Sequence, residues 1–104
     1  MDADTFLHDN VRYRLYRWDG PEIGQYAQCP EENTLGRQAL FAAQQSLSHA
    51  ERITIKVLDE APTGVKLADI FVDDAELGAQ LQDQGFIVPW DHESRDAKPD
   101  WCSN

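Results

Sequence analysis

Four side chains near the N-terminus, Asp4, Arg14, Asp19 and Glu22, are of the types that bind and hydrolyse a phosphodiester. An arginine fork binds and neutralises a phosphate, and a neighbouring carboxylate takes a proton from water. Asp4 and Asp19 offer hard oxygen ligands that suit Ca²⁺ or Mg²⁺ together with a carbonyl and waters. Each group also has a structural alternative, because turn aspartates cap their own backbone and an arginine beside a glutamate forms surface ion pairs.

A predicted β-hairpin would position these side chains. Residues 3–8 are β-compatible, an Asp-Asn turn signal follows, and residues 11–18 alternate between apolar and basic side chains. Arg14 falls on the polar face of the second strand. Asp4 and Asp19 lie near the strand ends, so we expect them at the same rim of the sheet, close together and facing solvent.

Beyond this hairpin, hydrophobic spacing and turn residues predict further helices and strands. In chain order these are a helix over residues 31–50, strands over 52–58 and 66–72, a short helix capped by Asp73 or Asp74 and ended by Gly85, and an extended piece over 86–90. Ile53, Ile55 and Val57 are expected to face inward. The order β-β-α-β-β-α-β is compatible with a small closed barrel and a packed helix, or with an open α+β sheet.

The charge of the chain limits its partners. It carries 9 basic and 19 acidic residues, a formal net charge of −10. Broad, salt-driven binding to nucleic acid needs a basic surface, so this charge disfavours it. However, Arg12, Arg14 and Arg17 fall within a stretch that contains no acid, and they could meet a phosphate locally. Trp18 and nearby tyrosines either stack on bases or, more commonly for aromatics at strand spacing, join the core.

The length of 104 residues suits one domain, which we place at residues 1–90, followed by an irregular tail at 91–104. No apolar run approaches the roughly 18 residues of a membrane helix. The first twenty residues carry charges where a signal peptide has an apolar stretch, so the default expectation is a cytoplasmic protein.

Cys29 and Cys102 are the two cysteines of the chain. Zinc would need about four nitrogen or sulfur ligands, and the histidines show no paired spacing with either cysteine. A disulfide and two reduced thiols both remain open. Trp101 is the large apolar anchor of the tail, and its burial would fold the tail back and bring the cysteines within bonding range. Such a disulfide would contribute up to about 4 kcal/mol on the chain-entropy model.

Four segments resemble the thermonuclease (staphylococcal nuclease-like) family. Residues 14–22 (RLYRWDGPE) are similar to its Arg-x4-Asp-(Thr/Ala)-Pro-Glu motif, which is the specific match. Residues 2–5 (DADT) resemble its Asp-Gly-Asp-Thr motif, and residues 63–68 (TGVKLA) resemble its Tyr-Gly-Arg-x-Leu-Ala segment. Residues 77–89 resemble the helix and strand that follow.

This resemblance implies a β-rich α+β fold, a small OB-fold barrel with packed helices. It implies a metal-dependent phosphodiesterase, a nuclease that hydrolyses the backbone of DNA or RNA. Asp4, Asp19 and the Gly20 carbonyl would hold Ca²⁺ or another divalent cation. Glu22 would be the general base that activates water, and Arg14 would stabilise the charge that develops on phosphorus.

The sequence departs from the family pattern in three places. Val65 replaces the second catalytic arginine, which implies weak turnover. Gly20 replaces the usual Thr or Ala but keeps the carbonyl. Most of the first strand is missing, which leaves an unpaired edge that a second copy could cover as a homodimer. The alternatives are a catalytically inactive nuclease-like module that binds nucleic acid or protein, and a domain whose function depends on a larger assembly.

Overall fold

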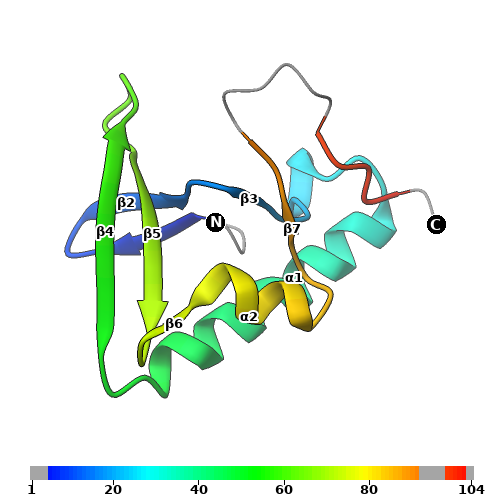
Figure 1. Cartoon of the computed structure of the whole chain (residues 1–104). Helices are drawn as coiled ribbons and strands as arrows, with labels where there is room; N and C mark the ends of the chain where they lie inside the picture. The colour runs from blue at the N-terminus through cyan, green and yellow to red at the C-terminus, as the bar shows by residue number, and fades with distance from the viewer. Residues whose placement is uncertain (1–4, 92–97, 103–104) are drawn as a thin grey trace.

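The computed structural model describes residues 5–91 and 98–102 and shows a small α+β fold (Figure 1). Its elements are β1 (Thr5–His8), β2 (Val11–Leu15), β3 (Trp18–Asp19), the 3₁₀ helix η1 (Gly24–Tyr26), α1 (Pro30–Ser48), β4 (Ile53–Glu60), β5 (Lys66–Val72), β6 (Ala75–Glu76), α2 (Leu77–Asp83) and β7 (Val88–Pro89). Among the described residues, no helix has the length and apolar character needed to cross a membrane.

The main sheet has five strands in the order β1-β2-β5-β4, with β6 paired to β5. β1 and β2 form the predicted antiparallel hairpin, in which Asp9 and Asn10 supply the left-handed turn with φ values of 50° and 63°. β2 runs parallel to β5, and β4 runs antiparallel to it. The predicted strand over 11–18 is wrong beyond Leu15, because Trp18 and Asp19 leave this sheet and pair with β7.

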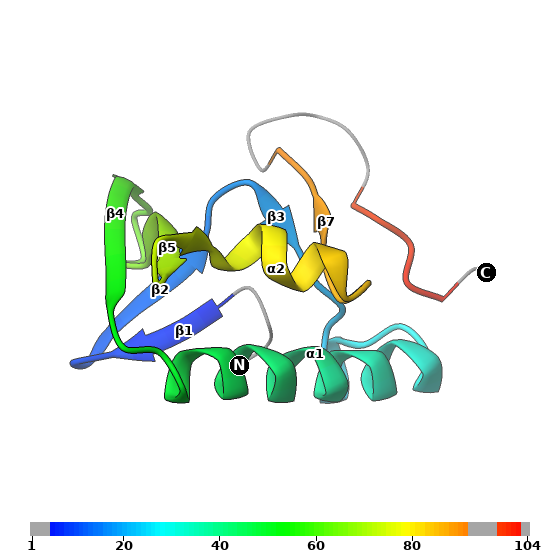
Figure 2. The same cartoon turned by 60° about the horizontal axis from the view of Figure 1, so that its bottom comes forward.

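One apolar core joins the sheet to both helices. Figure 2 shows α1 along one side of the molecule, with α2 and the strands packed above it. The core residues are Phe6, Leu15, Trp18, Ala39, Ala43, Ile70, Val72, Leu77, Leu81 and Ile87. Trp18 is buried and donates its indole N–H to Glu76 Oε1 at 2.9 Å, so it belongs to the core and offers no face to a base.

The strand β4 differs from the prediction in its exposure. Ile53 and Val57 were expected to face inward, yet they are 42% and 48% exposed, because β4 is an edge of the sheet. Of the three β4 residues that were expected to face inward, only Ile55 packs against the core. β1 is the other edge, so the described residues form an open sheet and no closed barrel. A cavity of about 200 Å³ lies between residues of β1 and β4.

The start of α2 also differs from the prediction. Asp73 and Asp74 do not cap this helix, which begins at Leu77 after the N-cap residue Glu76. The two aspartates have φ values of 50° and 70° and form the tight turn between β5 and β6. Asp73 Oδ1 instead accepts the backbone N–H groups of residues 51 and 52, at 2.9 and 2.8 Å, and holds the loop that leads into β4. Gly85 ends α2 as predicted, with φ of 82°.

Candidate functional site

The carboxylates of Asp19 and Glu22 converge on one positive charge. Asp19 ends β3, which pairs with β7, and its side chain is only 1% exposed. Glu22 follows three residues later, in the loop before η1. Lys98 Nζ lies 3.4 Å from Asp19 Oδ1 and 3.4 Å from Glu22 Oε1. Sequence reasoning identified both carboxylates but missed Lys98, because a lone lysine in a polar tail carries no local signal.

We name residues 98–102 the C-terminal strap. Within it, Trp101 donates its indole N–H to Asp19 Oδ2 at 3.1 Å, so both oxygens of Asp19 face groups of the strap. Lys98 Nζ also lies 5.9 Å from the centre of the Trp90 ring, a cation–π contact. Trp90 is held in turn by its backbone N–H, which donates to the Arg17 carbonyl at 2.9 Å.

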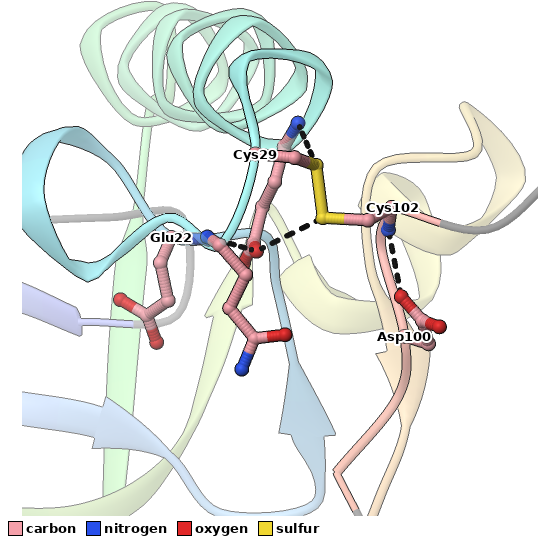
Figure 3. Close-up of a disulfide and its surroundings, with 6 residues drawn as sticks. Glu22, Cys29, Asp100 and Cys102 are labelled. Carbon is pink, nitrogen blue, oxygen red and sulfur yellow. Dashed lines mark hydrogen bonds between the residues drawn. A yellow bond between two sulfur atoms is a disulfide. The ribbon is translucent and has the colours of Figure 1, made fainter.

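A disulfide between Cys29 and Cys102 fastens the C-terminal strap to the N-terminal end of α1 (Figure 3). Of the two alternatives that the sequence left open, the structure contains the disulfide, and it closes a sequence separation of 73 residues. Glu32 Oε1 lies 3.9 Å from Cys102 Sγ, so the disulfide also contacts the first turn of α1. Cys102 also donates its backbone N–H to Asp100 Oδ1 at 2.8 Å, which shapes the end of the strap.

A second set of contacts holds the loop that carries Glu22, and it comes from the first turns of α1. The buried carboxylate of Glu32 accepts the backbone N–H of Glu22 at 2.8 Å and that of Gln28 at 2.9 Å. Asn33 Oδ1 accepts the backbone N–H of Gly24 at 2.8 Å. Such charge-assisted bonds to backbone N–H groups are strong, so Glu22 is placed by α1 as well as by β3.

The role of Glu32 was missed by sequence reasoning, which predicted a helix over residues 31–50 but gave this glutamate no separate role. Its position offered a signal. Cys29 is the N-cap of α1, and its Sγ accepts the Glu32 N–H at 3.4 Å, so Glu32 occupies the third helical position. A glutamate at this position commonly turns back toward the chain before the helix. In this protein the Glu32 side chain reaches past the N-cap residue Cys29 to the loop that carries Glu22.

Gly36 lets α1 approach the backbone of this loop. A Cβ atom at position 36 would lie 2.7 Å from the Glu22 carbonyl oxygen and 2.9 Å from that of Pro21. These distances are shorter than van der Waals contact, so a larger residue would push the helix and the loop apart. The helix backbone is therefore a rigid support directly beneath Glu22.

The remaining predicted site residues lie on neighbouring elements or outside the described residues. Arg14 is half-buried in β2, with its Nε atom buried, between Thr5 of β1 and Leu67 of β5. Gly20 is buried beside Asp19. Val65 is half-buried immediately before β5, on the face that Leu67 shares with Arg14.

Asp4 lies outside the described residues, so its predicted place beside Asp19 stays a prediction. The expectation that Asp19 faces solvent is wrong, because its side chain is only 1% exposed. Within residues 5–91 and 98–102, no group of three or more His, Cys, Asp or Glu side chains is placed to hold a metal ion. The two hard oxygen donors that do converge, from Asp19 and Glu22, already face a cation. This donor chemistry fits Ca²⁺ or Mg²⁺ and does not fit zinc.

A comparison of the sequence with models of protein families finds no match, and a comparison with curated proteins finds none either. The function is therefore inferred from the residues and their geometry.

We predict that Glu32→Gln lowers the free energy of unfolding by about 1–3 kcal/mol, because an amide presents a single acceptor atom and leaves one partly buried backbone N–H without its charge-assisted bond. Chemical denaturation with urea measures the change. Glu31→Gln is the matched control, since Glu31 is exposed in the same helical turn and its loss should shift the free energy by less than about 0.5 kcal/mol. Equal effects of the two substitutions would contradict the role of Glu32 in holding the loop that carries Glu22.

The titration of Lys98 provides a second prediction. Burial lowers the pKa of Lys98, but the negative charges of Asp19 and Glu22 raise it by more, so the pKa lies above the ordinary value of 10.5. The stabilisation from Lys98 is therefore fully present below pH 10.5 and is lost as the pH rises through the folded-state pKa. An NMR titration of the Lys98 side chain should show a midpoint above 10.5 that falls in Asp19→Asn. A midpoint that is insensitive to this substitution would argue against the ion pair.

Proposed function

We propose that this protein is a metal-dependent phosphodiesterase of the thermonuclease-like type, acting weakly on the backbone of nucleic acid. The observation that supports this most directly is the convergence of the Asp19 and Glu22 carboxylates on one positive charge, within the Arg-x4-Asp-x-Pro-Glu spacing that begins at Arg14. Two carboxylates that share a cation create the negative potential that a divalent ion requires.

In this proposal each residue has a separate role. Asp19, the Gly20 carbonyl and Asp4 would hold Ca²⁺ or a similar cation, which when bound would polarise a phosphate oxygen. Arg14 binds the phosphate through its guanidinium and neutralises charge on its oxygens. Glu22 takes a proton from the attacking water, whose oxygen forms the new bond to phosphorus while the sugar oxygen leaves. Base identity would matter little, because the contacts are to the phosphate.

We also propose that the sheet is part of an OB-type barrel that a second copy of the chain completes. β1 and β4 are its two edges, and apolar side chains are exposed on both: Leu7 at 54%, Ile53 at 42% and Val57 at 48%. An exposed apolar edge favours pairing with another chain. Sedimentation equilibrium should therefore detect a dimer that Val57→Lys weakens. A monomer at every concentration would reject this part of the proposal.

The second candidate function is a catalytically inactive module of the same type. Two observations favour it: Val65 stands where the family pattern has an arginine, and the net charge is −10. The two candidates differ in whether the carboxylates and Arg14 are positioned for chemistry, which a substitution at Val65 tests.

We predict that Val65→Arg raises Ca²⁺-dependent cleavage of single-stranded DNA at least about tenfold, equal to roughly 1.4 kcal/mol of barrier. The new guanidinium would lie on the sheet face that carries Arg14 and would bind the same phosphate. Initial rates are measured at low salt, with and without dithiothreitol, because the C-terminal strap contacts the carboxylates.

Two controls accompany this measurement. Val65→Gln has a similar length without the charge and should not increase the rate. The gain should also vanish when Glu22→Gln is added, because an arginine stabilises charge but cannot take a proton from water. If Val65→Arg folds normally and cleaves no faster in either redox state, the inactive module becomes the better interpretation.

A further inference from the structure

We propose that the C-terminal strap is a redox-controlled inhibitor of the carboxylate site. With the Cys29–Cys102 disulfide intact, Lys98 and Trp101 occupy Asp19 and Glu22. Reduction of the disulfide releases the strap and exposes both carboxylates. The consequence for cation binding depends on the proposed function, whereas the release of the strap does not.

The contacts of the strap occupy the groups that a cation would need. Lys98 Nζ lies 3.4 Å from Asp19 Oδ1, and the Trp101 indole N–H bonds to Asp19 Oδ2 at 3.1 Å. The same ammonium lies 3.4 Å from Glu22 Oε1. The strap thus places one positive charge and one hydrogen-bond donor on a carboxylate that is only 1% exposed. A divalent ion at Asp19 would have to displace both groups.

We expect these non-covalent contacts to hold the strap less firmly than the disulfide does. The Lys98 side chain is 47% exposed, so water weakens its ion pairs. Trp101 is half-buried and contributes one hydrogen bond to Asp19. Residues 98–102 form no helix or strand, so the backbone contributes little further order. The disulfide lies next to Trp101 in the sequence and keeps the local concentration of the strap high at the site.

The Glu22 loop has its own support, which would survive reduction. Glu32 holds the backbone N–H of Glu22 at 2.8 Å, and Asn33 holds that of Gly24 at 2.8 Å. Neither bond is made by a cysteine, although Glu32 also contacts both sulfurs: its Oε1 lies 3.9 Å from Cys102 Sγ and its N–H bonds to Cys29 Sγ at 3.4 Å. Cys29 would keep its position as the N-cap of α1 as a thiol. Breaking the disulfide would therefore free the strap while Glu22 stays in place, which distinguishes a switch from a structural crosslink.

The chemical step is thiol–disulfide exchange with a dithiol reductant. A thiolate of the dithiol attacks one sulfur of the protein disulfide, which breaks the S–S bond and gives a mixed disulfide and one cysteine thiolate. The second thiol of the reductant then attacks the mixed disulfide. Two electrons pass to the protein, the two protons of the dithiol end on Cys29 and Cys102, and the reductant leaves as its own disulfide. Both cysteines are only half-buried, so a reductant can approach them.

Two measurements on the full chain test this proposal, each with oxidised protein and with protein in excess dithiothreitol. NMR follows the Trp101 indole N–H, which should move to the position of a solvent-exposed indole on reduction. Calorimetric titration with CaCl₂ follows the site and should show at least tenfold tighter binding on reduction. The Cys29→Ser/Cys102→Ser variant should match the reduced protein in both measurements and be insensitive to dithiothreitol. Serine at position 29 retains a good N-cap.

The possible outcomes separate this proposal from the proposed function. An indole signal that does not move on reduction overturns the switch, as does Ca²⁺ binding that is measurable in both states with equal affinity. Loss of the dispersed spectrum on reduction also overturns it, because the disulfide would then be a structural crosslink. Movement of the indole with no Ca²⁺ binding in either state supports the redox-controlled strap and overturns the cation site of the proposed function. In oxidised protein, Lys98→Met should raise Ca²⁺ affinity, and a decrease would contradict the competition between Lys98 and the cation.

Discussion

The buried carboxylate of Asp19 is the constraint on which this end of the molecule depends. Its side chain is buried, and a buried charge is costly unless it is paired and hydrogen-bonded. Lys98 and Trp101 meet this requirement from the far end of the chain. Their position in turn brings Cys102 beside Cys29 at the start of α1. The path of the C-terminal strap thus follows from the need to neutralise one carboxylate.

The loop that carries Glu22 is supported from the opposite direction. The first turns of α1 offer it a buried carboxylate, an amide oxygen and the close backbone approach that Gly36 permits. These contacts are short and partly charge-assisted, whereas those of the strap are longer and more exposed. The Glu22 loop is therefore held firmly by α1, whereas the C-terminal strap that covers the carboxylates is held less firmly. This difference in strength is the physical basis for regulation at the site.

Charge and the unpaired sheet edges determine what the molecule could bind. A net charge of −10 repels nucleic acid at long range, so the proposed function would require Arg14 and its neighbours to attract a phosphate locally. The edges β1 and β4 expose apolar side chains around a small cavity, which favours a partner strand over solvent. The carboxylate site and these edges involve different elements, so binding at one does not require the other.

The sequence by itself determined the local elements and the spacing of the site. Period-two alternation identified the β1–β2 hairpin and the bounds Lys66–Val72 of β5, and helical spacing identified α1 within two residues at its C-terminal end. These features depend on residues that are close in the sequence, so the hydrophobic pattern is sufficient to predict them. Alternation also showed which residues of β4 share a face, but it could not show that Ile53 and Val57 would remain exposed, because that depends on what lies beside the strand.

Only the tertiary structure decided how the site is completed. Trp101 reaches Asp19 across 82 residues and Lys98 reaches Glu22 across 76, and no local pattern encodes such pairs. The departure of Trp18 and Asp19 from the first hairpin likewise required β7 as a partner. The two cysteines were compatible with a disulfide or with free thiols until the fold brought them together. Long-range proximity is a property of the packed chain, because it depends on where every intervening element lies.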